Sequence, residues 1–344
     1  MKNSFALFIF TSAFFVSPIK AQFSGYEENV SSGLGAGLYS EGVGLRNALA
    51  NSSGNPALLA YNKSSLVSFG LLANQQKQSN LAYQFNGSAY YQWNASMGFG
   101  VRARPMYSRS FPTEEKLQAY QGQVFLSYAL NDSIFLSFGI GPSLASRVGG
   151  ISSYSLSAYA SVGIVYDKFT FGISLESPGS FRMDSFLGSE RLRERLPERV
   201  SLGVQYDLNE YVFLYSELRR VIWERAYFRL NGIEEKPDYP SLTMFTGSFG
   251  LGWKYSSSSQ ILFGLANNTR ATQSSGLQKM YGASIGYATE LFPDAFGKGI
   301  FFNCFFQQNQ IRGSEPPIEV ERTLGLQLVY VLPSVQSLDN DMSK

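Results

Sequence analysis

Most of the chain after residue 65 alternates between apolar positions and small or polar positions, with a period of two residues. This alternation is typical of β-strands, in which successive side chains point to opposite faces. Fourteen segments follow it, at residues 66–73, 80–91, 95–104, 119–130, 133–147, 152–166, 168–176, 198–207, 211–222, 242–255, 260–266, 280–290, 299–310 and 321–332. An even number of such segments is what a closed bacterial barrel requires.

The two faces of these segments distinguish a membrane barrel from a soluble sheet. The apolar rows from Val124 to Leu130 and from Phe169 to Leu175 carry no charge. The opposite rows carry Gly, Ser, Gln and Thr, whereas the outer face of a soluble β-sandwich would carry Lys, Glu and Asp. We therefore expect an all-β fold, a transmembrane antiparallel β-barrel of about 14 strands with its apolar rows in lipid.

The connections between the segments alternate in length. Short turns follow the even-numbered segments up to the tenth, and the connections after odd-numbered segments are longer. In outer-membrane barrels the short turns face the periplasm and the longer loops face outward. Both ends of the chain are therefore expected in the periplasm. Residues 292–298 form the one long exception among the short turns.

The first 21 residues have the features of a secretory signal. Lys2 precedes an apolar run from Phe5 to Val16, and Ala21 is a small residue suited to a cleavage site. The run is too short to span a bilayer as a helix. This predicts localisation in the outer membrane of a Gram-negative-type bacterium. The expected divisions are a signal peptide at 1–21, an N-terminal periplasmic or luminal hatch at 22–64, the barrel at 65–333 and a polar tail at 334–344.

Composition agrees with a membrane barrel and argues against catalysis. Charged residues make up 16% of the chain, and aromatic residues make up 15%, where soluble proteins average about 25% charged residues. The net charge of +2 suggests no nucleic-acid partner. Histidine is absent, which removes histidine-based acid–base chemistry and histidine metal sites. Neither an enzyme activity nor a metal or cofactor is expected, and the single Cys304 allows no intrachain disulfide.

A glycine-rich stretch precedes the first strand segment. Six glycines lie between Gly33 and Gly54, and an Asn55-Pro56-Ala57 turn follows them. Dense glycine lets a backbone bend sharply and approach another backbone closely, and the spacing at 45–49 allows one or two helical turns. The stretch is either an ordinary lead-in loop or a compact plug inside the barrel. Because fourteen strands enclose more space than wall side chains fill, the lumen is either a water channel or plugged, and this stretch is well placed to be the plug.

Positions that face the lumen carry aromatic residues and cations beside polar groups. The candidate ligand-contacting aromatic residues are Phe125, Phe135, Tyr159, Tyr211, Phe213, Tyr215, Phe301 and Phe305. The luminal cations are Arg102, Arg199, Arg219 and Lys254. These cations have two possible partners: a ligand carboxylate, or Glu217 and other luminal acids.

Two stretches carry a family resemblance. Residues 33–59, which contain LYSEGVGLRNALANSSGNPALL, resemble the N-terminal hatch of the FadL-type outer-membrane long-chain fatty acid transporters, with Asn55, Pro56 and Ala57 at the place of the family's Asn-Pro-Ala motif. Residues 196–223 are similar to the family's hairpin that begins with Leu-Pro and ends at Trp. The resemblance implies passive passage of fatty acids or other hydrophobic compounds through a plugged barrel. It also implies lateral exit through a gap near the third strand once the hatch shifts.

The third strand segment carries residues that fit this implied exit. Gly98, Gly100 and Pro105 weaken or end strand pairing, so they are candidates for the lateral gate; the alternative is that they are ordinary barrel glycines. The loop at 178–197 contains SFLGSERLRERL, which suits an anionic amphiphile or a surface that faces solvent or lipopolysaccharide.

The expected partners are a hydrophobic small molecule or fatty acid, outer-membrane lipids and lipopolysaccharide, and the barrel-assembly machinery. Two other functions remain open alongside lipid transport. Related barrels serve secretion systems as membrane scaffolds or shuttles, and a nonspecific porin would have the same alternation. A diffusion porin would show rings of charge in its lumen, where this chain has aromatic residues.

Overall fold

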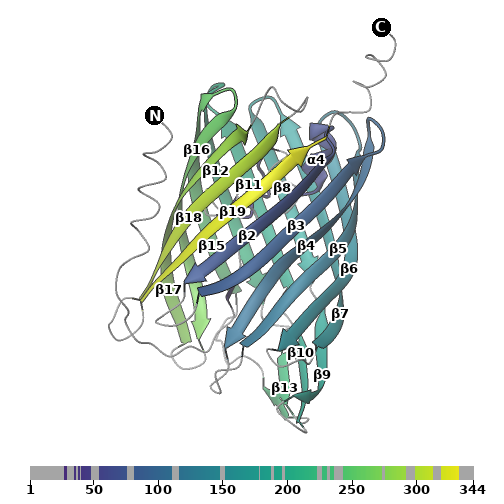
Figure 1. Ribbon diagram of the computed structural model, residues 1–344, viewed down its shortest axis with the longest axis vertical. Coiled ribbons are helices and arrows are strands. Elements are labelled where there is room, and N and C mark those ends of the chain that lie inside the picture. Colours follow the sequence, from purple (N-terminus) through teal and green to yellow (C-terminus); the bar gives the residue numbers. More distant parts are fainter. Residues whose placement is uncertain are drawn as a thin grey trace.

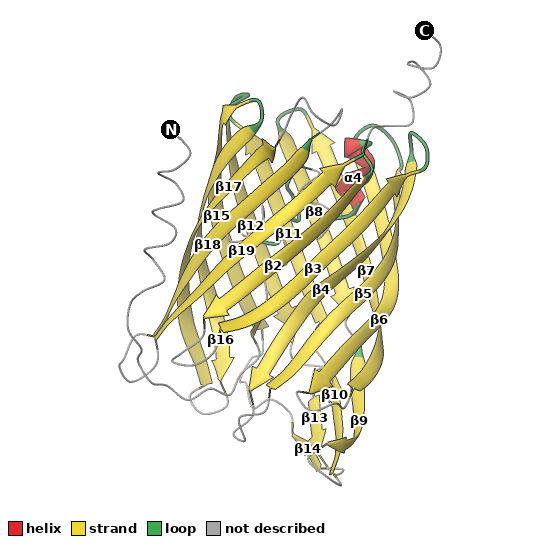
Figure 2. Ribbon diagram, in the orientation of Figure 1, coloured by secondary structure: helices red, strands yellow, loops and turns green. Residues whose placement is uncertain are grey.

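The computed structural model is a closed antiparallel β-barrel, which confirms the predicted fold class (Figures 1 and 2). Each barrel strand pairs with the next along the chain, β4 pairs with β5, and β19 pairs with β2 to close the ring. The fourteen barrel strands are β2 (Leu66–Gln75), β3 (Leu81–Gln92), β4 (Met97–Ser110), β5 (Lys116–Ala129), β6 (Ile134–Arg147), β7 (Ser152–Tyr166), β8 (Phe169–Ser177), β11 (Glu198–Asp207), β12 (Val212–Ile222), β15 (Thr243–Ser256), β16 (Ser259–Thr272), β17 (Gly276–Leu291), β18 (Ile300–Arg312) and β19 (Glu319–Val331).

The structure describes residues 27–28, 35, 38, 40–47, 54–75, 81–110, 116–147, 152–177, 179–186, 190–195, 198–222, 227–230, 233–235, 243–272, 276–291, 299–312 and 319–332. The predicted signal at 1–21, the tail at 334–344 and the long turn at 292–298 lie outside these residues.

All fourteen predicted segments are strands, but several are longer than the alternation indicates. The third runs to Ser110 instead of 104, and the eleventh runs to Thr272 instead of 266. The connection between β16 and β17 is therefore only residues 273–275, so the longer loop expected after the eleventh strand is wrong. A strand of nine to eleven residues is enough to cross a bilayer, so these strands extend beyond it.

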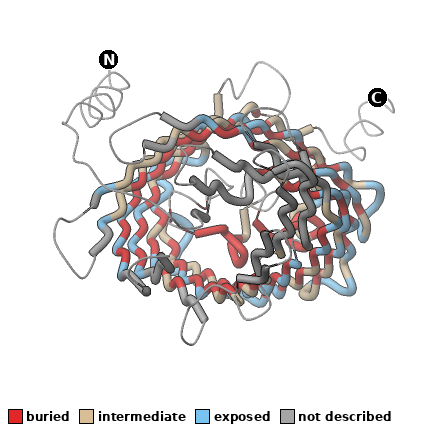
Figure 3. The backbone as a smooth tube through the Cα atoms, turned by 90° about the horizontal axis from the view of Figure 1, so that it is seen from below, coloured by how far each residue is buried: buried red, intermediate tan, exposed pale blue. Residues whose placement is uncertain are grey.

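The outside of the barrel is apolar. Side chains alternate between buried and exposed along each strand, and β8 does so without a break. Figure 3, which looks along the barrel, shows the buried positions on the inner side of the wall. The exposed row of β8 is Phe169, Phe171, Ile173 and Leu175. This surface matches the lipid-facing band of a membrane-spanning barrel.

Aromatic residues gather on this outer surface at the end that carries the short turns. Trp93, Tyr166 and Trp253 are exposed there, and the Tyr255 hydroxyl donates to the Tyr287 hydroxyl at 2.9 Å. Aromatic girdles mark the interfaces of outer-membrane barrels. The girdle therefore places one membrane boundary near the short turns, and the barrel is of the outer-membrane type.

A second, four-stranded sheet lies beyond the opposite end of the barrel (Figure 1). Its strands are β9 (Ser180–Phe186), β10 (Glu190–Arg195), β13 (Tyr227–Leu230) and β14 (Ile233–Glu235), in the order β14-β13-β10-β9. They follow or precede β8, β11, β12 and β15 in the chain and keep the same lateral order, so this outer sheet continues the wall. Residues 180–186 and 190–195 form a hairpin, so the interpretation of this part of 178–197 as a loop is wrong.

A short helix, α4 (Ala57–Asn62), follows the Asn-Pro step. Pro56 has a φ of −58°, which suits the start of a helix, and the Asn55 side-chain oxygen accepts the Ala57 N–H at 3.1 Å. The expected turn at Asn55-Pro56-Ala57 therefore starts a helix. Residues 45–47 are not helical, so that part of the expected helix at 45–49 is wrong, while 48 and 49 lie outside the described residues. No helix among the described residues is long and apolar enough to cross a membrane.

Candidate functional site

The glycine-rich stretch lies inside the barrel near the end with the short turns. Its described residues between 35 and 62, here called the inner segment, contact the luminal face of the wall, and Figure 3 shows buried chain within the ring of strands. Leu38 and Leu45 are fully buried beside the luminal side chains Phe213 and Tyr215. Leu59 packs in a second luminal cluster with Phe125. The inner segment is thus part of the core of the molecule.

Glu217 of β12 binds the backbone of the inner segment. Its carboxylate accepts the N–H groups of Glu41 at 3.0 Å, Gly42 at 3.1 Å and Val43 at 3.1 Å. The Tyr215 hydroxyl donates to the same carboxylate at 2.6 Å. Successive N–H groups that converge on one anion form a backbone nest, and Gly42 has the left-handed φ of 78° that this turn needs. One buried carboxylate therefore satisfies three main-chain donors.

Charged side chains extend this contact across the wall. Glu41 of the inner segment lies 3.5 Å from Arg199 and 3.7 Å from Arg219. Arg199 also pairs with Glu176 of β8 at 3.1 Å, and Arg104 of β4 binds Glu176 as well. Burial raises the pKa of the Glu41 carboxyl, but Arg219 and Arg199 outweigh burial, so this pKa is lowered from its usual value. A buried charge left without any partner is strongly destabilising, and Arg199 and Arg219 each have two carboxylate partners here.

Glycines in the wall let the inner segment approach the strands closely. A Cβ at Gly172 of β8 would overlap the carbonyl oxygen of Val43, and a Cβ at Gly203 of β11 would overlap the backbone of Gly44. These glycines pair directly across the strands. The wall is therefore shaped at this point to receive the inner segment.

The Asn-Pro-Ala motif provides a second set of contacts. The Asn55 amide donates to the Val43 carbonyl at 2.8 Å and to the Val162 carbonyl of β7 at 3.0 Å. The Ser127 hydroxyl donates to the Pro56 carbonyl at 2.7 Å. Ala57 packs in a buried cluster with Phe135. The motif thus links the two halves of the inner segment and holds both against the wall.

Most of the predicted luminal aromatic residues are buried, and they contact protein. Phe125, Phe135, Phe213 and Tyr215 pack in clusters with the inner segment, and the Tyr159 hydroxyl donates to the Gly54 carbonyl at 3.0 Å. These residues surround the inner segment, which favours a packing role for them at this level of the barrel.

The three remaining aromatic predictions have different surroundings. Phe301 is partly buried and packs against the cluster that contains Leu59 of the inner segment, whereas Phe305 is buried with Leu72. Tyr211 is not a luminal wall residue: it is 54% exposed in the turn before β12. The Asn209 side chain accepts the N–H groups of Tyr211 and Val212, so the strand begins only after Tyr211.

The four predicted cations have different surroundings. Arg199 and Arg219 pair with luminal acids, which confirms that alternative for both; Arg219 lies 3.4 Å from Glu217. Arg102 is buried over the ring of Tyr159, 4.1 Å from its centroid, and donates to Gln123 at 2.7 Å. Its contact with an aromatic face is a cation–π interaction.

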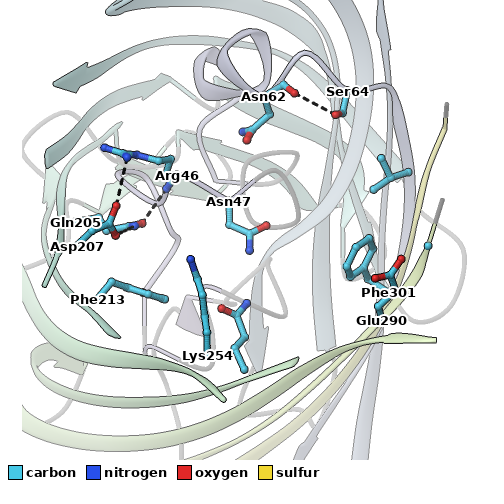
Figure 4. Close-up of a pocket in the computed structure, with 13 residues that line it drawn as sticks. Arg46, Asn47, Asn62, Ser64, Gln205, Asp207, Phe213, Lys254, Glu290 and Phe301 are labelled. Atoms are coloured by element: carbon cyan, nitrogen blue, oxygen red, sulfur yellow. Dashed lines mark hydrogen bonds and ion pairs between the residues drawn. The ribbon is translucent and has the colours of Figure 1, made fainter. Parts of the chain in front are cut away.

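Lys254 lines a cavity of about 430 Å³ between the inner segment and the wall (Figure 4). Phe213 and Phe301 line the same cavity, so it brings three of the predicted residues together. Arg46 of the inner segment borders it, and its guanidinium lies 3.3 Å from Asp207. The cavity lies at the end with the short turns, where β11, β12, β15 and their neighbours start or stop.

The wall is incompletely paired between β3 and β4. Residues 87–92 of β3 pair with 98–103 of β4, but among the described residues no pairing joins 81–86 of β3 to 104–110 of β4. Six residues of a strand span about 20 Å. On its other edge β4 pairs with β5 along its whole length, with an irregular register between Pro105 and Tyr107.

The three gate candidates fall on different sides of this interruption. Gly98 and Gly100 are paired with Gln92 and Tyr90, so the idea that they end the pairing is wrong. A Cβ at either position would overlap an aromatic side chain, so their small size serves packing. Pro105 lies just beyond the last pair, where its missing N–H would leave a gap in a ladder.

Sequence reasoning did not identify Glu41, Glu176, Arg104 or Arg46 as functional. Glu41 is the one acidic residue in SEGVG, and this could have indicated a buried contact. The same sequence is equally typical of an exposed loop. Glu176 and Arg199 occupy directly opposite positions of β8 and β11, so their pairing follows from the register once it is known.

Solved structures with the same fold include a FadL homologue, a hydrocarbon channel and a toluene transporter. A FadL homologue from Pseudomonas aeruginosa is 12% identical, with a TM-score of 0.70 over 89% of this chain and 99% of its own. The CymD monoaromatic hydrocarbon channel is 11% identical, with a TM-score of 0.68 over 88% and 98%. The toluene transporter TodX of Pseudomonas putida is 10% identical, with a TM-score of 0.64 over 90% and 99%.

These likenesses define the class of protein. The chain is a transmembrane β-barrel of the outer-membrane type whose amino-terminal segment lies in its lumen, and its fold is that of the FadL-type channels. At these identities the likeness concerns the fold. The chain matches no protein-family model and no curated protein in sequence.

Proposed function

We propose that this protein passes hydrophobic small molecules across the outer membrane, with the inner segment as its plug and a lateral exit between β3 and β4. The observation that carries the proposal is the interrupted pairing of these two strands, which is longer than the interruption between 243–246 of β15 and 268–272 of β16 among the described residues. Solved barrels of the same fold are described as a toluene transporter and a monoaromatic hydrocarbon channel.

A lateral exit suits an apolar cargo. Lipid headgroups and lipopolysaccharide hinder an apolar solute from reaching the membrane interior, and an exit into the hydrocarbon spares it a return to water. An unpaired strand edge is costly wherever it is shielded from water, because its N–H and C=O groups then have no partner. A wall that keeps such an edge despite this cost is therefore best explained by a use for it.

The outer sheet gives the scaffold alternative one supporting feature. Its strands β9, β10, β13 and β14 extend past the barrel and present an accessory surface of the kind that partners use. A scaffold would co-purify with a protein partner and would not speed uptake. A nonspecific porin would instead show high, steady single-channel conductance.

The test is uptake of labelled oleate and toluene by a bacterial strain that lacks its own barrel of this fold. Expression of the parent chain is expected to raise uptake. Replacing Pro105→Val restores an N–H and a strand-forming side chain to β4, and uptake is expected to fall at least about fivefold as pairing extends. Pro142→Val is the matched control, because Pro142 lies in the paired strand β6 opposite Leu156. Equal uptake by both variants and the parent would exclude exit at this position.

A further inference from the structure

The interruption between β3 and β4 is partly occupied by another piece of the same chain. β1 (Glu27–Glu28) pairs antiparallel with β4, Glu27 opposite Ser108 and Glu28 opposite Tyr107. Tyr107 and Ser108 also pair with Ala119 and Gln118 of β5. A strand has two edges, so β1 occupies the edge of β4 that β3 leaves free.

We propose that β1 is a removable strand of the wall: it covers the free edge between β3 and β4 and leaves it when a molecule passes. This inference rests on the proposed lateral exit and adds the part that opens. The site is a sheet edge that accepts an extended peptide, which is the recognition mode called β-strand addition. Its occupant is the amino-terminal strand of this chain.

The extent of pairing shows why β1 would leave more readily than any other strand. β1 pairs through two residues, whereas β16 and β17 pair without interruption from Ser259 to Thr272. Each backbone pair adds a small net contribution, so a two-residue contact is the weakest in this sheet. Pro105 and the irregular register beside it also limit how far β1 extends along β4.

Release of β1 does not require the inner segment to move. The inner segment is held at Glu41 by Glu217 and Arg219 of β12 and by Arg199 of β11. These direct contacts lie on strands other than β4, with which β1 pairs. The opening step is assigned to a two-residue strand, while the plug remains in place.

A disulfide that locks β1 tests the proposal. Glu27→Cys and Ser108→Cys are introduced into the full chain, with the native Cys304→Ser to remove the only other thiol. The crosslink is expected to form under mild oxidation, to reduce oleate and toluene uptake at least about fivefold, and to be reversed by reductant. Opposite residues of an antiparallel pair lie within disulfide reach.

The matched control is Ser68→Cys with Ser88→Cys in the same Cys304→Ser background. These serines lie opposite each other on β2 and β3, with their oxygen atoms 2.6 Å apart, so a crosslink there joins strands that are already paired. Its uptake is expected to stay within about twofold of the parent.

Two results would overturn the inference while leaving the proposed function intact. One is a parent chain that takes up the compounds and a crosslinked β1 that does not slow them. The other is failure of the Glu27–Ser108 pair to crosslink in folded barrels under conditions where the control pair does. A parent chain that takes up neither compound instead refutes the proposed function, and the inference with it.

Discussion

Two parts of the same wall differ in how completely they are built. At β8, β11 and β12 the strands are paired throughout, and luminal side chains from them bind the inner segment through buried carboxylates, arginines and glycines. At β3 and β4 the ladder stops after Gly87 and Ala103, and the free edge is covered by two residues. The wall at β8, β11 and β12 is therefore held by many contacts, and the wall at β3 and β4 is held by few.

This difference indicates which part of the molecule can move at a low cost in free energy. Displacing the inner segment would break a buried carboxylate away from three N–H groups and separate charges in a region of low dielectric, which costs several kcal/mol. Opening the wall between β3 and β4 breaks a two-residue contact. The resemblance noted in the sequence implied that the hatch shifts before a molecule leaves. Under the proposed lateral exit, the contacts instead favour a fixed inner segment and release of β1 beside it.

The largest expected effect comes from breaking the anchored part at Glu217. Glu217→Ala leaves three main-chain donors and Arg219 without this carboxylate, and docking of the inner segment is expected to weaken by about 3–5 kcal/mol. Trypsin should then cut rapidly after Arg46, and single-channel conductance should rise while the barrel stays folded.

The control for this change is Glu198→Ala, which removes a partly exposed carboxylate 3.3 Å from Arg195. Exposed pairs of this kind contribute less than about 1 kcal/mol, so cleavage after Arg46 should stay slow. Equal protection of Arg46 in both variants would show that Glu217 does not anchor the inner segment.

A smaller loss of stability is expected from a substitution that adds a methyl group between the wall and the inner segment. Gly172→Ala places a methyl group against the Val43 carbonyl, where the backbone must shift, and overpacking of this kind costs about 1–3 kcal/mol. Gly247→Ala is the matched control on β15, because a Cβ there meets nothing within 4 Å. Thermal unfolding and trypsin cleavage should distinguish the two; identical behaviour would contradict the close approach.

The sequence was sufficient for the barrel and insufficient for the contacts inside it. Lipid accepts only apolar side chains, so each strand had to alternate, and rows such as Phe169 to Leu175 revealed it. The outer sheet lies past the lipid, and its mixed sequence at 190–195 was read as a loop. Glu217 was recognised as a possible partner for luminal cations, but its three backbone contacts depend on where residues 41–43 fold, which no periodicity encodes.

The interruption between β3 and β4 could also be predicted only in part from the sequence. Pro105 was a visible signal, because proline cannot donate to a ladder. Gly98 and Gly100 gave the same signal and are fully paired, since their role is to make room for Tyr90 and Phe125. A glycine in a strand has several physical causes that only the neighbouring side chains distinguish.

The smallest expected effect is the pH dependence of the anchored part, through Glu41. Because the pKa of Glu41 is lowered from 4.5 in the folded chain, its contribution is fully present above pH 4.5 and is lost as the pH falls through the lowered value. Trypsin does not work at such pH, so pepsin cleavage of the inner segment is the measurement, with the parent becoming sensitive only well below pH 4.5. Glu41→Gln removes this titration and weakens docking at neutral pH by about 1 kcal/mol, since Arg199 and Arg219 keep their other carboxylate partners. A parent chain that loses protection already above pH 5 would place the sensitive group elsewhere and would refute the assignment to Glu41.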